Sequence, residues 1–199
     1  MKHEKSMSRR KFLGSSISGL VGAGIVGSSQ AHLSAEDTDM NAKVKDYRVL
    51  GRTGFKTSDI AFGAGMLTSP QILESALDLG INYIDTGEHY MNGMSEKAIG
   101  EVIKTRKRKS LFITTKLNLN FGGKATKQNI KNRFYKCLER LKTDYVDCLM
   151  MHMARDIEQL KHEDFHTAVK ELKSEGKIRF CGVSNHGPKQ SIYGKMEVP

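Results

Sequence analysis

The chain has 199 residues, which is enough for one domain with a substantial core. It carries 32 Lys and Arg against 22 Asp and Glu, a formal net charge of +10. The three cysteines, Cys137, Cys148 and Cys181, have no CxxC pairing, which argues against a disulfide framework or a cysteine metal site and favours buried free thiols. The densest basic run, 104–109, has no interleaved aromatic residues, so we interpret it as a solvated helix end and expect no nucleic-acid partner.

Residues 1–31 have the order of an export signal. The charged segment Ser8-Arg9-Arg10-Lys11-Phe12-Leu13 precedes a weakly apolar stretch, 17–28, and a small-residue site, Ser29-Gln30-Ala31. The paired arginines resemble the twin-arginine signal. A membrane anchor is the alternative, but the apolar stretch is shorter than the ~20 residues that a span needs. We expect a periplasmic or otherwise exported protein with transient contact with the export machinery and no stable membrane span.

The same segment contains a G-x-G-x-x-G sequence, from Gly22 to Gly27. This pattern binds dinucleotides only where it follows a strand within a strand-helix-strand unit. Only the charged leader precedes it here, so we reject it as a cofactor site.

The body of the chain begins after a polar linker, 32–46, and is assigned to residues 47–199. Tyr47–Leu50 and Phe55–Ser58 flank Gly51-Arg52-Thr53-Gly54, which predicts a hairpin with a glycine-rich turn. Beyond it, short apolar strands alternate with amphipathic segments. The predicted strands are Ile60–Gly63, Tyr83–Asp85, Leu111–Thr115, Tyr145–Met150 and Phe180–Val183.

The intervening segments have helical spacing. The first is expected to start after Ser69, to bury Ile72, Ala76 and Leu79, and to stop at Gly80. The third follows Thr126 and has the clearest apolar face, formed by Ile130, Phe134, Cys137, Leu138 and Leu141.

Strand-helix alternation predicts an α/β fold with a parallel sheet, either a barrel or an open doubly wound sheet. A (β/α)8 barrel of the TIM type has eight such units and ~250 residues. Five units are recognisable, so we expect a partial TIM-type barrel with an N-terminal hairpin, truncated at its C-terminal side.

Four polar residues lie at or just past the carboxyl ends of predicted strands: Asp85, Tyr90, Lys116 and His152. Such ends converge on one mouth of a parallel barrel, where barrel enzymes carry out chemistry. Taken alone, each residue has a structural interpretation: Asp85 as a helix cap, Lys116 as a surface residue and His152 as a core histidine. Together they predict a proton-transfer site.

These residues belong to motifs that resemble the aldo/keto reductases over residues 47 to about 187. The motifs are Asp85–Tyr90, Gly93–Glu96, Thr115-Lys116, Tyr145–Asp147 with His152, and Gly176–Arg179 leading to Gly182–Asn185. Gly87 departs from the alanine that is usual after Asp-Thr and is expected to loosen the loop. Glu88 and His89 are expected at the rim, and Asp147, inside a strand, is expected to need a buried partner.

The resemblance implies a role for each strand-end residue. Tyr90 would be the general acid that protonates a carbonyl oxygen. Lys116 would stabilise its phenolate, Asp85 would hold the ammonium of Lys116, and His152 would orient the substrate oxygen through a hydrogen bond. The implied reaction is the NAD(P)H-dependent reduction of small aldehydes and ketones.

The implied cofactor is NADP, or alternatively NAD, and the nicotinamide supplies the hydride. Ser184 and Asn185 match the family positions that hold the nicotinamide carboxamide. The strands that would complete the pocket and clamp the adenosine phosphate lie beyond those recognised here.

Two other functions remain open. The run His162-Glu163-Asp164-Phe165-His166 spells the H-E-x-x-H of zinc hydrolases. However, Asp164 is well placed to cap a helix whose buried face is Phe165, Ala168, Val169 and Leu172, which would leave His162 outside that helix. The second alternative is a non-catalytic, reductase-like binding module.

Overall fold

The computed structural model describes residues 43–185. The predicted export signal, the G-x-G-x-x-G run and most of the linker lie outside these residues. By its contacts the chain divides into two units, Met1–Met40 and Asn41–Pro199, and every described residue belongs to the second. Within that described part, no helix is long and apolar enough to cross a membrane.

A two-stranded antiparallel hairpin opens the described unit, as predicted. Its strands are β1 (Tyr47–Val49) and β2 (Lys56–Ser58), and Tyr47 pairs with Ser58. The turn contains a short 3-10 segment, Gly51–Thr53, and ends at Gly54, whose φ of 70° lies in the left-handed region that favours glycine.

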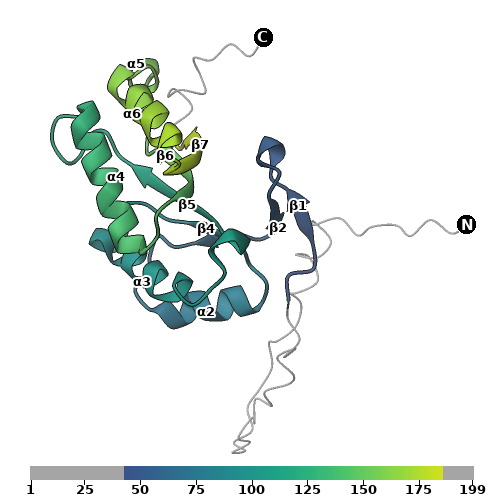
Figure 1. Cartoon of the computed structure of the whole chain (residues 1–199). Coiled ribbons are helices and arrows are strands. Elements are labelled where there is room, and N and C mark those ends of the chain that lie inside the picture. The colour runs from purple at the N-terminus through teal and green to yellow at the C-terminus, as the bar shows by residue number, and fades with distance from the viewer. Residues whose placement is uncertain (1–42, 186–199) are drawn as a thin grey trace, which may run out of the picture. The chain divides into compact units, whose positions relative to one another are not determined.

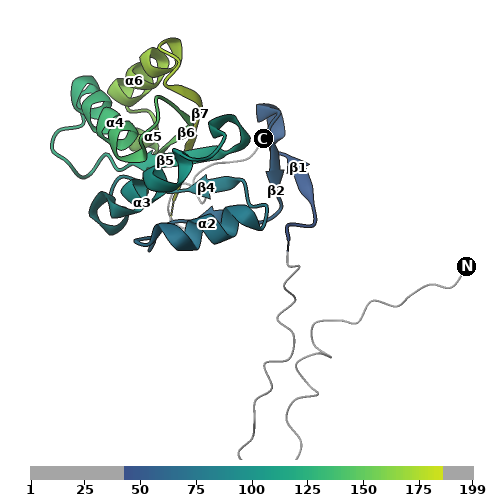
Figure 2. The ribbon, with the colours of Figure 1, turned by 60° about the horizontal axis from the view of Figure 1, so that its bottom comes forward.

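Five parallel strands form the second sheet, and they lie in chain order. They are β3 (Phe62–Gly63), β4 (Tyr83–Asp85), β5 (Phe112–Leu117), β6 (Val146–Met151) and β7 (Ile178–Val183). The main helices are α2 (Pro70–Asp78), α3 (Met94–Ile103), α4 (Lys127–Leu141) and α6 (Glu163–Ser174), with a short α5 (Ile157–Leu160). They line one side of the sheet (Figures 1 and 2). The hairpin lies at the amino end of the sheet, where the Ser58 N–H donates to Asn82 Oδ1 just before β4.

This arrangement confirms the predicted fold: an incomplete TIM-type barrel of βα units with an N-terminal hairpin. Its core lies between the sheet and the helices, where Ile84, Ile113, Leu117 and Leu149 are fully buried. The apolar face predicted for α4 is buried at every position: Ile130, Phe134, Cys137, Leu138 and Leu141. Thr126 caps this helix by accepting a hydrogen bond from the Asn129 N–H at 3.2 Å.

The face predicted for α2 is partly wrong. Ile72 is 60% exposed and Leu79, which lies past the last residue of the helix, is 43% exposed. Leu73 is fully buried instead. The helix spans only nine residues, so its few apolar positions did not define which face turns inward.

Two further predictions need correction. His162, not Asp164, is the N-cap of α6, and its Nδ1 accepts a hydrogen bond from the Phe165 N–H at 3.4 Å. Cys181 is exposed rather than buried, because β7 is an edge strand of the sheet. Cys137 and Cys148 are buried free thiols, as predicted.

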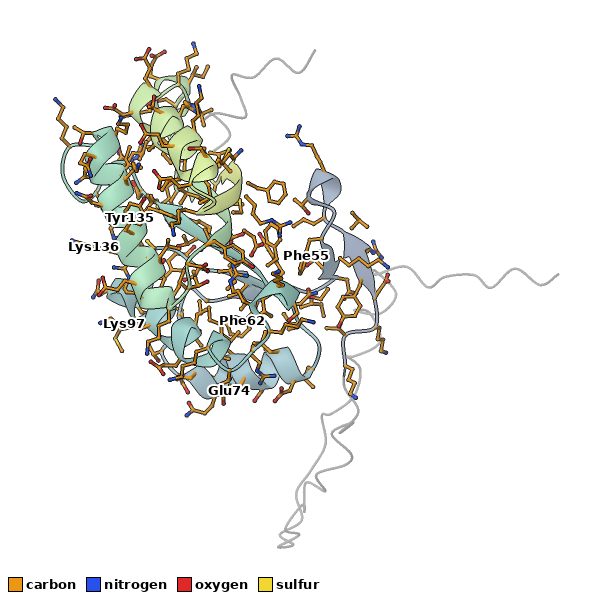
Figure 3. The ribbon with its side chains drawn as sticks, in the orientation of Figure 1. Phe55, Phe62, Glu74, Lys97, Tyr135 and Lys136 are labelled. Carbon is orange, nitrogen blue, oxygen red and sulfur yellow. The ribbon has the colours of Figure 1, made fainter. Side chains whose placement is uncertain are left out.

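Helices α3 and α4 approach each other closely at Gly100. A Cβ atom there would lie 2.4 Å from the carbonyl oxygen of Arg140. The outward faces of the same helices carry Lys97, Tyr135 and Lys136, which Figure 3 shows on the side away from the sheet.

Candidate active site

The four predicted site residues lie at the carboxyl ends of three neighbouring strands. Asp85 is the last residue of β4, Lys116 is the penultimate residue of β5, and His152 directly follows β6. Tyr90 begins a short 3-10 turn, Tyr90–Gly93, in the loop after β4. Parallel pairing of β4 with β5 and of β5 with β6 therefore places these ends side by side.

The ammonium group of Lys116 lies at the centre of the site. Lys116 is only 4% exposed, and its Nζ forms an ion pair with the carboxylate of Asp85. The same Nζ donates to the Thr86 carbonyl oxygen at 2.8 Å and to the Tyr90 hydroxyl at 3.2 Å. A buried ammonium needs such compensation, because an unpaired charge in the interior is costly.

His152 packs against the ring of Tyr90. Its imidazole ring meets the Tyr90 ring edge-on, with centroids 5.6 Å apart and an interplanar angle of 79°. His152 is 5% exposed, and its backbone N–H donates to the Leu117 carbonyl at 2.8 Å. The structure thus brings a phenol, an ammonium, a carboxylate and an imidazole together; their catalytic roles remain predictions.

Backbone hydrogen bonds hold the loop that carries Tyr90 against β5. The Thr86 N–H donates to the Thr114 carbonyl at 2.9 Å, and the Glu88 N–H donates to the Lys116 carbonyl at 3.1 Å. A Cβ atom at Gly87 would make ordinary contacts, 3.5 Å from Tyr90 Cε1 and 3.6 Å from Lys116 Cβ. The loop therefore has room for the alanine that is usual at this position.

The backbone after Tyr90 takes an uncommon path. Met91 and Asn92 have φ values of 50° and 55°, and Gly93 follows with a φ of 83°. Left-handed conformations are unfavourable for non-glycine residues and are often found near functional sites. Helix α3 begins directly afterwards, at Met94.

A buried ion pair next to this loop was missed by the sequence analysis. Glu88 was expected at the rim, but its side chain is 7% exposed and pairs with Arg133 of α4, whose side chain is 10% exposed. Arg133 Nε donates to Glu88 Oε2 at 3.0 Å, and its Nη2 donates to the Asn118 carbonyl at 2.7 Å. The available signal was a basic residue three positions after Ile130, on the apolar face of a helix.

The Glu88 carboxylate also joins two loops. Its Oε1 accepts a hydrogen bond from the Asn118 N–H at 2.9 Å, just after β5. His89, by contrast, is a rim residue as predicted: its side chain is 45% exposed, and its ring lies edge-on to Phe121 at 5.1 Å. The Glu88–Arg133 ion pair thus links the Tyr90 loop, the loop after β5 and helix α4.

Two more buried acids support the strands beneath the site. Glu96 is fully buried and accepts from Thr115 Oγ1 at 2.6 Å and from Arg140 Nε at 2.7 Å. Asp147, which was expected to need a buried partner, accepts from the buried Ile113 N–H and from two guanidinium groups that are only partly buried. Its two oxygens accept from Arg108, Arg179 and the Ile113 N–H at 2.9 to 3.0 Å.

A second phenol, Tyr83, lies on β4 below the site. Its hydroxyl is 3.1 Å from that of Thr114, and burial raises its pKa above the ordinary value. The Tyr83 hydroxyl is thus paired with Thr114, whereas the Tyr90 hydroxyl accepts a hydrogen bond from the Lys116 ammonium.

Ser184 and Asn185, the predicted cofactor residues, follow β7 at the same end of the sheet. The Ser184 N–H donates to the Met151 carbonyl at 2.9 Å, and its carbonyl accepts from the Ala154 N–H at 3.0 Å. Asn185 Nδ2 donates to the Ala154 carbonyl at 2.7 Å. A hydroxyl and a carboxamide are thus held beside the segment after His152, where their chemistry fits the amide of a nicotinamide.

The two histidines of the H-E-x-x-H run have backbone partners. His162 caps α6, and His166 Nε2 lies 2.6 Å from the Leu160 carbonyl oxygen. Between residues 43 and 185, no group of three or more His, Cys, Asp or Glu side chains is arranged to hold a metal ion.

The comparisons of this chain with known proteins agree on one family. The model of the aldo/keto reductase family matches residues 59–193. An uncharacterised oxidoreductase of Bacillus subtilis is 34% identical over 152 residues, which are 71% of this chain and 49% of the relative. L-galactose dehydrogenase of Arabidopsis thaliana is 32% identical, over 70% of this chain and 48% of the plant enzyme. The chain thus spans about half the length of these curated relatives.

Solved structures show the same likeness. An aldo-keto reductase of Bacillus halodurans in its holo form is 32% identical with a TM-score of 0.62, covering 72% of this chain and 51% of that one. An aldo-keto reductase of Klebsiella pneumoniae in complex with NADPH is 28% identical with a TM-score of 0.60, covering 73% and 51%.

Proposed function

We propose that this chain, which belongs to the aldo/keto reductase family, carries the proton-transfer residues of an oxidoreductase. The proposed reaction is the reduction of aldehydes and ketones to alcohols. The observation that carries this proposal is the position of the buried Lys116 ammonium, which contacts the Tyr90 hydroxyl at 3.2 Å and the partly exposed Asp85 carboxylate. A carbonyl that accepts hydride develops negative charge on oxygen and needs a proton donor within hydrogen-bond reach.

Tyr90 is the proposed donor. The Lys116 ammonium stabilises the phenolate that forms when the proton leaves, and Asp85 keeps that ammonium in place. His152, whose ring lies edge-on to that of Tyr90, donates a hydrogen bond to the same carbonyl oxygen and so orients it. Each of these groups acts more strongly in a site from which water is excluded.

NADPH is the proposed cofactor, with NADH as the alternative. When bound, the nicotinamide supplies the hydride. Ser184 and Asn185 are the residues of this chain proposed to hold its carboxamide, since both lie at the strand ends beside His152. The Klebsiella pneumoniae structure in complex with NADPH supports this cofactor.

The proposed function is tested by the oxidation of NADPH in the presence of small aldehydes and ketones, followed by the loss of nicotinamide absorbance. We expect oxidation that requires both the full chain and the carbonyl compound, with the alcohol identified by mass spectrometry. NADH replaces NADPH in a parallel series. No oxidation with either cofactor would overturn the proposal for this chain.

We also propose that the protein is exported by the twin-arginine pathway to the periplasm. The support is the charged, apolar and small-residue order of residues 1–31, with Arg9 and Arg10 as the paired arginines. The full chain with Arg9→Lys and Arg10→Lys is expected to stay in the cytoplasmic fraction of a bacterial host, while the unaltered chain reaches the periplasm. Equal distribution of both would contradict the proposal.

A further inference from the structure

A cavity lies at the end of the sheet opposite to the candidate active site. Its volume is about 540 Å³, and it is lined by Thr53, Gly54, Phe55, Lys109, Tyr145 and Arg179. These residues come from the hairpin turn and from the amino ends of β5, β6 and β7. Strands β5, β6 and β7 are six residues long, so the two ends are roughly 15 to 20 Å apart.

Among residues 43–185, the lining contains two cationic side chains, Lys109 and Arg179, and no acidic one. The acid beneath it, Asp147, is 1% exposed and already engaged through both oxygens. Its Oδ1 accepts from Arg179 Nη1 at 2.9 Å, and its Oδ2 accepts from Arg108 Nη2 at 2.9 Å. One carboxylate is therefore shared by two guanidinium groups, and the surroundings of the cavity keep a positive excess.

Both cations remain available to a ligand. The side chain of Arg179 is 49% exposed, and only its Nη1 donates to another residue in the described part of the chain. The Lys109 ammonium forms no ion pair within residues 43–185, and Lys109 is exposed. A guanidinium and an ammonium at one cavity form charge-assisted hydrogen bonds with an anion, which are stronger than neutral ones.

The aromatic walls of the cavity are fixed by packing. The Phe55 ring lies 5.4 Å from that of Phe112, and Figure 3 shows Phe55 on the side of the hairpin that faces the sheet. The Tyr145 ring is covered on one face by the Arg108 guanidinium, 4.0 Å from its centroid. Arg108 is itself held by Thr143 Oγ1 at 3.2 Å. Rigid aromatic surfaces of this kind suit a flat apolar ring.

We propose that this cavity binds a small aromatic carboxylate, with its acid group between Lys109 and Arg179 and its ring against Phe55 and Tyr145. The volume lies within the range of roughly 300 to 1,000 Å³ that is typical of small-molecule sites. The site is independent of the proposed reductase chemistry, because it shares no residue with the strand ends that carry Tyr90 and Lys116.

The test is a titration of the ¹⁵N-labelled full chain with benzoate, followed by two-dimensional NMR, with neutral benzyl alcohol of similar shape in a parallel titration. We expect saturable shifts for the amides of Gly54 and Lys109 and for the side-chain Nε of Arg179. Benzyl alcohol should bind roughly ten-fold more weakly, since it lacks the charge. Shifts confined to the strand ends near Lys116, or equal binding of both compounds, would overturn the proposal.

Two matched variants distinguish benzoate binding in the cavity from a general effect of positive charge. Lys109→Gln is expected to weaken benzoate binding roughly ten-fold. Lys107→Gln removes the same charge two residues away, outside the cavity lining, and is expected to leave the affinity within about two-fold. The amide spectra of both variants report whether they are folded. Equal weakening by the two variants, or no weakening by Lys109→Gln in a folded protein, would refute the site.

Discussion

The Lys116 ammonium lies 3.2 Å from the Tyr90 hydroxyl, although the two residues are 26 positions apart in the chain. The contact depends on the pairing of β4 with β5 and on the backbone bond between Glu88 and Lys116. It makes Lys116 the residue through which Asp85 can influence the phenol.

Replacing Lys116 by methionine should therefore reduce the rate of carbonyl reduction. The side chain keeps a similar volume but loses the charge that stabilises the phenolate, so we expect kcat to fall by about 100-fold or more. The free energy of unfolding should change by less than about 2 kcal/mol, because the Asp85 carboxylate that loses its partner is 30% exposed and can be solvated. Steady-state kinetics and urea unfolding check both expectations. Lys136→Met on the exposed face of α4 is the control, and similar rates for the two variants would contradict the role.

The Glu88–Arg133 pair predicts a stability effect next to the site. Glu88→Gln leaves the Arg133 guanidinium buried without its counter-charge, and we expect a loss of about 3 kcal/mol in the free energy of unfolding. Adding Arg133→Met removes the stranded charge and should recover part of that loss. Urea unfolding measures both variants, with Glu74→Gln on the exposed face of α2 as the control (Figure 3). Additive losses in the double variant would show that the two side chains do not act as a pair.

The close contact between α3 and α4 predicts a large effect of one methyl group. Gly100→Ala would place a Cβ 2.4 Å from the Arg140 carbonyl oxygen, a backbone atom that cannot move alone. We expect a loss of about 2 kcal/mol or more, although alanine is the better helix former. Lys97→Ala on the exposed face of α3 should stay within about 0.5 kcal/mol. Thermal unfolding of the two variants checks the difference, and a more stable Gly100→Ala would contradict the packing described.

Stability should depend on pH through Cys148. Burial raises the pKa of its thiol from 9.0 to about 11, so the unfolded chain releases this proton at a lower pH than the folded chain. The contribution of Cys148 is complete below about pH 9 and is lost as the pH rises towards 11, an effect on the order of 2 to 3 kcal/mol. Cys148→Ala should therefore show a shallower decline in the free energy of unfolding between pH 9 and 11. Parallel declines in the two proteins would contradict the shift.

Much of the fold follows from local patterns. The face of α4 is defined by five apolar residues at helical spacing, and Thr126 marks its start, so both were predicted correctly. The hairpin was likewise predicted correctly from its glycine-rich turn. Helix α2 has fewer apolar positions, and there the expected face was partly wrong: Ile72 is exposed and Leu73 is buried.

The parts that escaped prediction depend on contacts between distant residues. Glu88 and Arg133 are 45 positions apart, and in the sequence each reads as a solvated charge. Their burial follows from the way α4 packs beside the loop after β4, and its local sign in the sequence is the position of Arg133 on the apolar face of α4. His162 is a different case: its imidazole caps α6 through a local contact with the Phe165 N–H, where an aspartate was the expected cap.

Tyr90 is proposed to supply the proton in carbonyl reduction. The most direct measurement compares NADPH oxidation with one aldehyde in the full chain, in Tyr90→Phe and in Tyr135→Phe, which alters an exposed tyrosine of α4. We expect Tyr90→Phe to lower the rate by at least about 100-fold, while Tyr135→Phe retains the rate of the unaltered chain. Equal rates in Tyr90→Phe and the unaltered chain would contradict it.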